Sequence, residues 1–355
     1  MAETNVFIGS YTTDLGWVRG KGQGITAYKL DLLSGVLSQA SSVKADNPSF
    51  LALHPSGHVL YANNEASHEP NASDDSVSAF EIKGGGSLTL LNQRPSHGAS
   101  PCFVSVDPQA GFAFLANFNG GNFVVYPLGK DGSLESCSDK ASHQSSLANQ
   151  LTPHAHSITP SPSGRYLLAC DLGLDKLFIY RLDRQQGKLV SHGEFAVAKG
   201  SGPRHVSFHP TARFVYLINQ DAGQILVIEW DDVLGTLTER QIVATVPDDF
   251  SGDPAASEIQ VHPSGAFLYA SNRGHNNIVI FRIDQSSGLL HQVGDQPSLG
   301  LTPRNFALTP CGTLLLVGNQ DSDQVVVFRI DPVSGLLHEL HSQAIPTPVC
   351  IVCGS

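Results

Sequence analysis

Three arginines stand where apolar runs begin or end, and they are the side chains of this sequence best suited to chemistry. Arg204 precedes the run HVSF, Arg304 precedes NFAL, and Arg273 follows FLYASN. A guanidinium donates two parallel hydrogen bonds to a carboxylate or a phosphate, so such a group suits a small anion. His156, in the segment PHAHSI, adds a side chain that exchanges a proton near neutral pH. These residues together indicate an anion-binding site with a proton-transfer group.

A motif that occurs seven times supplies the elements that must position these residues. Each copy is a run of about four apolar or aromatic residues, a short link and a glycine turn, which is typical of a β-hairpin. The seven glycines are Gly35, Gly86, Gly132, Gly187, Gly235, Gly288 and Gly335. Between the copies lies a second pair of apolar runs joined by a turn, as in FLALHPSGHVLYANNE. Each unit therefore holds four strands.

Four-stranded units of this length, repeated seven times, predict an all-β fold, a seven-bladed β-propeller of antiparallel blades. The chain ends predict how the ring closes. NVFIGSYT begins with a strand that has no inner partner before it, and TPVCIVCGS ends with an inner strand that has no second strand after it. We expect the two to pair in one blade, which removes open sheet edges. Residues 1–355 are thus expected to form a single domain.

In a propeller, the first inner strand of each blade starts and the second ends at the same mouth of the central channel. The predicted strand-starting positions are Ser49, Cys102, His156, Arg204, Ser257 with Glu258, Arg304 and Val349. The predicted strand-ending pairs are Asn64-Glu65, Asn117-Phe118, Asp171-Leu172, Asn219-Gln220, Asn272-Arg273 and Asn319-Gln320, with Ser10-Tyr11 from the N-terminal blade. The first member of the six pairs is always Asn or Asp, which predicts a structural role. The second member varies, as expected of functional positions on a fixed scaffold.

Two interpretations of the arginine cluster stay open at this point. It binds an anionic ligand, or it forms ion pairs with Glu65, Asp171 and Glu258 around the rim. His154 and His156 would share one strand face, but no further ligand cluster is evident, so no metal and no cofactor are predicted. His156 is either a general acid or base or a hydrogen-bonded structural histidine.

Composition narrows the range of partners. The formal net charge of −11 disfavours nucleic acid, and no apolar run approaches the length of about 20 residues that spans a bilayer. The start MAETNVFIGS lacks the features of a signal peptide, so we expect a cytoplasmic protein whose six cysteines are thiols. The expected partner is a small anionic substrate, bound by a monomer or a weak homo-oligomer.

Several segments carry a resemblance to a known family. FIGSYT, TPHAHSI, CDLGLDKL, GSGPRH, ASNRGHN and LTPRNF resemble the seven-bladed propeller lactonases, which include propeller-type 6-phosphogluconolactonases and the carboxy-cis,cis-muconate cyclising enzymes. The resemblance implies a hydrolase for a small anionic lactone, with a sugar-phosphate lactone as the favoured substrate. A cycloisomerase is the second possibility, and a binding propeller without catalytic power is the third.

The resemblance also assigns site residues. The site proposed for the muconate-cyclising branch has a histidine, two arginines and a glutamate, and Gln220 stands at the glutamate's position. An amide takes up no proton near neutral pH, so the base would be lost or replaced, with Glu65 and Glu258 as candidates. The residues expected to be catalytic are His156, Arg204, Arg273, Gln220 and Glu65. The residues expected to bind substrate are Arg304, His154, Asp171, Glu258 and Gln320.

Overall fold

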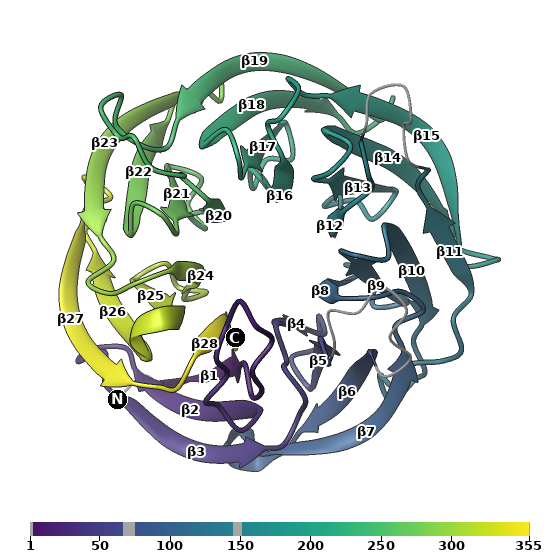
Figure 1. Cartoon of the computed structure of the whole chain (residues 1–355), viewed down its shortest axis with the longest axis horizontal. Coiled ribbons are helices and arrows are strands. Elements are labelled where there is room, and N and C mark those ends of the chain that lie inside the picture. Colours follow the sequence, from purple (N-terminus) through teal and green to yellow (C-terminus); the bar gives the residue numbers. More distant parts are fainter. Residues whose placement is uncertain (1–2, 67–74, 145–150, 355) are drawn as a thin grey trace.

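Seven antiparallel sheets of four strands each stand side by side around a central channel (Figure 1). This computed structural model describes residues 3–66, 75–144 and 151–354. The seven-bladed propeller predicted from the repeats is confirmed, and so is its strand count per blade.

Each sheet runs from an innermost strand at the channel to an outermost strand at the rim. The innermost strands are β4 (Phe50–Leu53), β8 (Pro101–Val106), β12 (Ala155–Pro160), β16 (Pro203–Phe208), β20 (Ala256–Val261), β24 (Pro303–Leu308) and β28 (Pro348–Cys353). The second strands are β5 (Val59–Asn64), β9 (Phe112–Asn117), β13 (Tyr166–Asp171), β17 (Phe214–Asn219), β21 (Phe267–Asn272), β25 (Leu314–Asn319) and β1 (Glu3–Ser10).

The two outer positions complete the blades. The third strands are β6 (Ser76–Ile82), β10 (Asn122–Pro127), β14 (Lys176–Asp183), β18 (Gln224–Asp231), β22 (Asn277–Ile283), β26 (Gln324–Ile330) and β2 (Ile25–Asp31). The outermost strands are β7 (Leu88–Pro95), β11 (Asp139–Ser142), β15 (Lys188–Ala196), β19 (Thr236–Ala244), β23 (Leu290–Pro297), β27 (Leu337–Ala344) and β3 (Leu37–Val43). Two 3₁₀ turns are η1 (Gly84–Gly86) and η2 (Gln320–Ser322). We number the blades 1 to 6 from β4 onward, and call β28 with β1 to β3 the closing blade.

The closing blade joins the two ends of the chain, as predicted. β28 lies innermost and pairs antiparallel with β1, with Phe7 opposite Val352 and Gly9 opposite Cys350. The C-terminal strand thereby supplies the inner edge that β1 lacks, and the ring has no open sheet edge at the junction.

Burial explains the composition of the strands. All six residues of β17 and of β25 are buried, because these strands lie between neighbouring blades on both faces. Exposed residues alternate with half-buried ones along most of β19, at the rim. Large side chains fill the space between blades: Phe267 and Tyr269 of blade 5 pack against Phe306 and Phe328 of blade 6.

At the mouth of the channel, the ladder between the first two strands of a blade contains an extra residue. Pairing passes from Pro203–Asn219 directly to His205–Ile218, so Arg204 has no partner in the ladder. The corresponding residues in four other blades are Cys102, His156, Arg304 and Val349. In blade 5, Ser257 and Glu258 lie opposite the single residue Ser271. A bulge of this kind re-aims the side chain of the extra residue. The predicted strand-starting positions are thus bulge residues in six of the seven blades.

A residue with a left-handed backbone precedes the inner strand in every blade except blade 3. The residue two positions before the strand-starting position has a positive φ, and these residues are Asn47, Ser100, Gly202, Ala255, Thr302 and Thr347. Only the glycine adopts this conformation without steric cost, so the surrounding structure must hold the others. The same turn therefore brings the chain into the inner strand in six blades.

In three blades, the Asn that ends the second strand fastens a loop at the mouth. Asn117, Asn272 and Asn319 donate to the backbone carbonyls of the residues that follow the outermost strand of the preceding blade, which are Ser96, Thr245 and Ser298. The Thr245 hydroxyl also donates to Asn272 Oδ1 at 2.7 Å. These bonds are the structural role expected of this position.

Asn219 lacks these bonds. It is 1% exposed, and within the described part of the chain neither its Oδ1 nor its Nδ2 has a partner. Val197 occupies the place that Thr245 has one blade further on, since both backbone N–H groups donate to the loop between the second and third strands of their own blade, Val197 to Asp175 and Thr245 to Gly223. Valine offers no hydroxyl to the amide.

We predict that Val197→Thr raises the free energy of unfolding by about 1 kcal/mol, because its hydroxyl would satisfy a buried acceptor. The matched change Thr245→Val should lower it by about 1–2 kcal/mol. Urea denaturation followed by circular dichroism measures both. Destabilisation by both substitutions would show that Val197 is not equivalent to Thr245.

Candidate active site

A cavity of about 300 Å³ opens at the mouth of the channel. Its walls are Trp17, Glu65, Cys102, Phe118, Asn119, His156, Gln220, Arg273 and Arg304. Residues directly after β5, β17 and β21 supply Glu65, Gln220 and Arg273, while bulges in β12 and β24 supply His156 and Arg304. Five of the ten residues expected at the site therefore meet here, from five different blades.

Gln220 is held between two arginines. Its Oε1 accepts hydrogen bonds from Arg273 Nη2 at 2.7 Å and from Arg204 Nε at 3.2 Å, and its Nε2 donates to Asp221 Oδ1 at 3.1 Å. Arg204 is 3% exposed and lies behind the amide rather than in the cavity wall. The structure therefore places Arg204 as a support of Gln220 and Arg273 as a cavity residue.

A second layer of polar residues lies next to Arg204 along the channel. Arg204 Nη1 donates to the carbonyl of Ser257 at 3.0 Å and to a ring nitrogen of His205 at 3.1 Å. Glu258 lies 3.5 Å from His205 Nδ1 and accepts a 2.6 Å hydrogen bond from Asn305. Glu258 is 6% exposed and does not line the cavity, so it is not available to replace a base at position 220.

Three other residues expected at the site, Asp171, His154 and Gln320, contact other residues around the mouth. The Asp171 carboxylate accepts from His143 Nδ1 at 2.6 Å and from the backbone N–H of His154 at 2.8 Å. The His154 ring stacks on Phe118, with ring centroids 4.5 Å apart, and so supports a cavity wall. Gln320 is buried and donates to the carboxylate that follows it. None of the three lines the cavity.

Arg304 is the guanidinium most open to a ligand. It lies over the rings of Trp17 and Tyr11, with its Cζ 5.1 Å and 5.8 Å from their centroids. No side-chain hydrogen bond or ion pair engages it among the described residues. In the same part of the chain, no carboxylate lies within 4.0 Å of Arg204 or Arg273 either. The expectation that the arginines pair with carboxylates around the rim is therefore wrong, since the acceptors they do use are an amide, carbonyls and an imidazole.

Burial, and after it the positive charges of the arginines, lower the pKa values of two groups that line the cavity. Burial, followed by the charge of Arg204, holds the pKa of His156 well below its usual value, so the imidazole is neutral at pH 7. Its Nδ1 is buried without a hydrogen-bond partner in the described structure. Burial also lowers the pKa of Arg273 to about 10, with Arg304 as the next cause.

Glu65 is the carboxyl group of the cavity. It is 3% exposed and accepts a 2.9 Å hydrogen bond from the hydroxyl of Tyr11. Burial raises the pKa of Glu65, and the charge of Arg304 and the hydrogen bond from Tyr11 oppose this shift. A carboxyl group whose pKa is moved toward neutrality is well suited to accept a proton from water.

Sequence reasoning left Trp17 out of the site. Trp17 belongs to the connection between β1 and β2, residues 11–24. The same connection has four residues in each of blades 2 to 6, so those repeats give Trp17 no aligned position. The pairing of Tyr11 with Glu65 was also missed, although Tyr11 was placed at the mouth. In the sequence, Trp17 is marked only by its place beside the Gly-rich segment RGKGQG.

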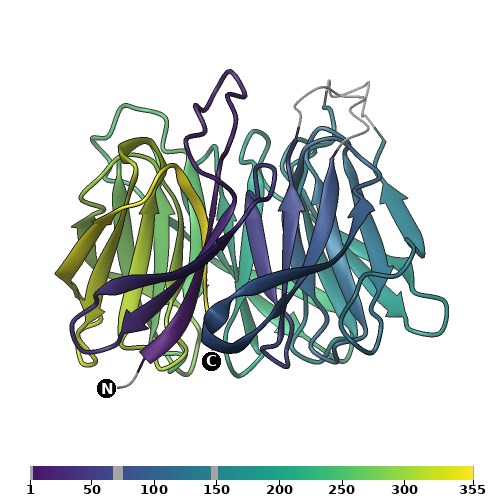
Figure 2. The ribbon, with the colours of Figure 1, turned by 90° about the horizontal axis from the view of Figure 1, so that it is seen from below.

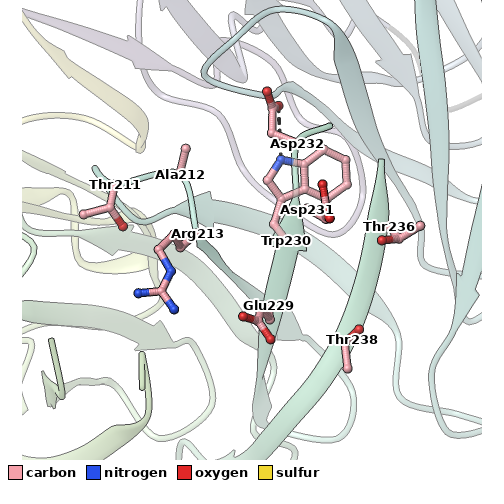
Figure 3. Close-up of a pocket in the computed structure, with 9 residues that line it drawn as sticks. All are labelled: Thr211, Ala212, Arg213, Glu229, Trp230, Asp231, Asp232, Thr236 and Thr238. Carbon is pink, nitrogen blue, oxygen red and sulfur yellow. Dashed lines mark hydrogen bonds between the residues drawn. The ribbon is translucent and has the colours of Figure 1, made fainter. Parts of the chain in front are cut away.

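A larger depression, of about 540 Å³, lies at the opposite end of blade 4 beside the turn before β17 (Figure 3). Its acidic groups have partners: Asp232 accepts from Arg165 and Trp230, and Glu229 pairs with Arg240. Asp231 accepts from the backbone N–H groups of Val233 and Leu234, and no histidine is among the described residues that line the depression. The mouth cavity is therefore the better candidate for catalysis.

In residues 3–66, 75–144 and 151–354, no group of three His, Cys, Asp or Glu side chains could hold a metal ion. Within the same ranges, no helix is long and apolar enough to cross a membrane.

Comparison with known proteins gives the class. A family described as seven-bladed β-propeller lactonases matches residues 5–353, and the chain belongs to this family. It is 35% identical to a 6-phosphogluconolactonase of Bacillus subtilis over 304 residues, covering 84% of this chain and 83% of the relative. It is 32% identical to a 6-phosphogluconolactonase of Formosa agariphila, covering 85% and 86%. The solved structure of a periplasmic gluconolactonase of Pseudomonas aeruginosa superimposes with a TM-score of 0.92 at 30% identity, covering 100% and 99% of the two chains.

We predict that Gln220→Glu weakens the binding of inorganic phosphate by roughly tenfold, or about 1.4 kcal/mol. The new carboxylate would form ion pairs with Arg204 and Arg273 and place a negative charge in the cavity wall. Gln320→Glu is the matched control, because Gln320 holds the same place in blade 6 and does not line the cavity. Calorimetric titration measures both, and equal losses in the two variants would contradict the assignment of Gln220.

Proposed function

We propose that this protein hydrolyses the lactone of a small sugar acid that carries an anionic group, and that a 6-phosphogluconolactone is its substrate. The observation that carries the proposal is the presence in one cavity of Arg304, which has no carboxylate partner among the described residues, and of Glu65, a buried carboxyl group. The names of the relatives from Bacillus subtilis and Formosa agariphila support the choice of substrate.

Binding would begin at the arginines. Arg304 would hold the phosphate through its guanidinium, since phosphate accepts two parallel hydrogen bonds from this group. Arg273 is fixed by bonds to Gln220 and to the carbonyl of Ala255, so its charge stays in place when the substrate arrives. A charge held in advance costs no reorganisation during the reaction.

Glu65 would accept the proton of the attacking water. The water oxygen forms a bond to the lactone carbonyl carbon, and the carbonyl π electrons move to its oxygen. Arg273 would stabilise the resulting oxyanion. The neutral imidazole of His156 would relay the proton held by Glu65, taking it up at one ring nitrogen while it gives up a proton from the other, so that the ring remains neutral as its low pKa requires.

Collapse of the intermediate opens the ring. The oxyanion electrons reform the carbonyl, the bond from the carbonyl carbon to the ring oxygen breaks, and the leaving alkoxide takes the proton held by Glu65. The products are a hydroxyl group and a carboxylic acid, which ionises in water. Because Gln220 replaces the glutamate of the muconate-cyclising branch, we favour hydrolysis over cycloisomerisation.

We propose that the protein acts in the cytoplasm, as a monomer or a weak homo-oligomer, on a small anionic substrate and without a cofactor. The absence of a carboxylate partner for the three arginines in the described structure supports the anionic substrate.

We predict that Glu65→Gln lowers kcat/KM for 6-phosphoglucono-δ-lactone at least 100-fold, because the amide removes the base while keeping the shape. In the native protein kcat/KM should fall as the pH decreases through the pKa of Glu65, which lies above the ordinary value of a glutamate. Spontaneous hydrolysis must be subtracted at each pH. If the Glu65→Gln variant kept its turnover and the same fall of kcat/KM at low pH, the base would be another group.

A further inference from the structure

The connection between β1 and β2 rises above the mouth as a short hairpin (Figure 2). Its backbone bonds run from Gly22 to Tyr11, from Gly20 to Thr13 and from Leu15 to Val18. The tip of this hairpin carries Trp17. No other blade has such a hairpin between its second and third strands in the described part of the chain, so this feature is not needed to build a blade.

The hairpin is fastened to the body of the propeller. Asn47 Oδ1 accepts hydrogen bonds from the backbone N–H groups of Thr12 and Thr13, at 2.7 Å and 3.1 Å. Val18 is 5% exposed and packs with Tyr11 and Val349. The position of Trp17 over the mouth is therefore fixed by the fold.

Trp17 presents an aromatic surface beside the open guanidinium. Its ring meets the edge of Tyr11 at an angle of 86°, with the centroids 5.3 Å apart, and Arg304 Cζ lies 5.1 Å from its centroid. Trp17 lines the cavity and is nevertheless 46% exposed, whereas Glu65 and His156 in the same wall are almost fully buried. An anion bound by Arg304 thus brings whatever is bonded to it next to the indole.

We propose that Trp17 is a stacking platform that makes the cavity selective for ring-closed sugar phosphates over ring-opened ones. This inference rests on the proposed function, because lactone hydrolysis converts a ring into a chain. A six-membered sugar ring is rigid and presents a face of C–H groups that packs on an aromatic surface. An open chain must lose several torsional freedoms to make the same contact. Trp17 therefore favours the substrate and lets the product leave.

Binding of two non-substrates tests the proposal without any turnover. Glucose 6-phosphate and sorbitol 6-phosphate share the phosphate and most hydroxyls and differ in the ring. We expect the native protein to bind glucose 6-phosphate roughly fivefold more tightly, the order expected for burying one apolar ring face. Trp17→Ala should remove this preference by weakening the cyclic ligand alone, and Trp17→Phe should keep most of it.

Arg304→Gln is the contrasting variant, and it should weaken both ligands by the same factor. Calorimetry gives the dissociation constants, and circular dichroism shows whether each variant is folded. A preference for glucose 6-phosphate that persists in Trp17→Ala, or an equal loss of both ligands in that variant, would overturn the inference. If instead the native protein shows the ring preference but hydrolyses no lactone, the proposed function fails and the stacking role stands.

Discussion

The candidate site depends on one feature of the backbone, the extra residue at the start of the inner strand. In a regular strand, successive side chains point to opposite faces of the sheet. Without the extra residue, the side chains of Arg304 and His156 would do the same. The bulge lets the strand pair normally below the mouth while one side chain per blade is re-aimed at the channel. The propeller can therefore vary these residues without disturbing the hydrophobic packing between blades.

Charge is the second constraint on the mouth. Removing a guanidinium from water is costly unless it is compensated, and a carboxylate is the usual compensation. Arg204 and Arg273 are instead satisfied by neutral acceptors, since Gln220 Oε1 lies between them and backbone carbonyls take further donors. Among the described residues no carboxylate lies within 4.0 Å of either guanidinium, and Glu258 and Asp253 act on Arg204 and Arg273 only from further away. An anionic ligand would compensate their positive charge, which is why the arrangement favours binding over a purely structural role.

The repeats made the fold and half of the site predictable. His156, Arg273 and Arg304 were placed at the mouth because each occupies a position that recurs in other blades. Glu258 could not be separated from Ser257 in the same way, since both lie opposite the single residue Ser271 and only the structure shows that Glu258 contacts Asn305. Asp171 was expected to bind substrate, but its carboxylate bonds to His143 instead. The sequence did not show this contact because His143 comes from the preceding blade. Trp17 lies in a connection that is much longer than its counterparts in blades 2 to 6, so those repeats give it no position.

Every role proposed for the mouth cavity requires that an anion bind there. A crystal structure of the protein with glucose 6-phosphate, which has no lactone bond to hydrolyse, tests this most directly. We expect phosphate oxygens at about 2.7–2.9 Å from the guanidinium nitrogens of Arg304, with the sugar ring against Trp17. A ligand bound in the depression beside Arg213 and Trp230, or at the mouth without contact to Arg304, would contradict it.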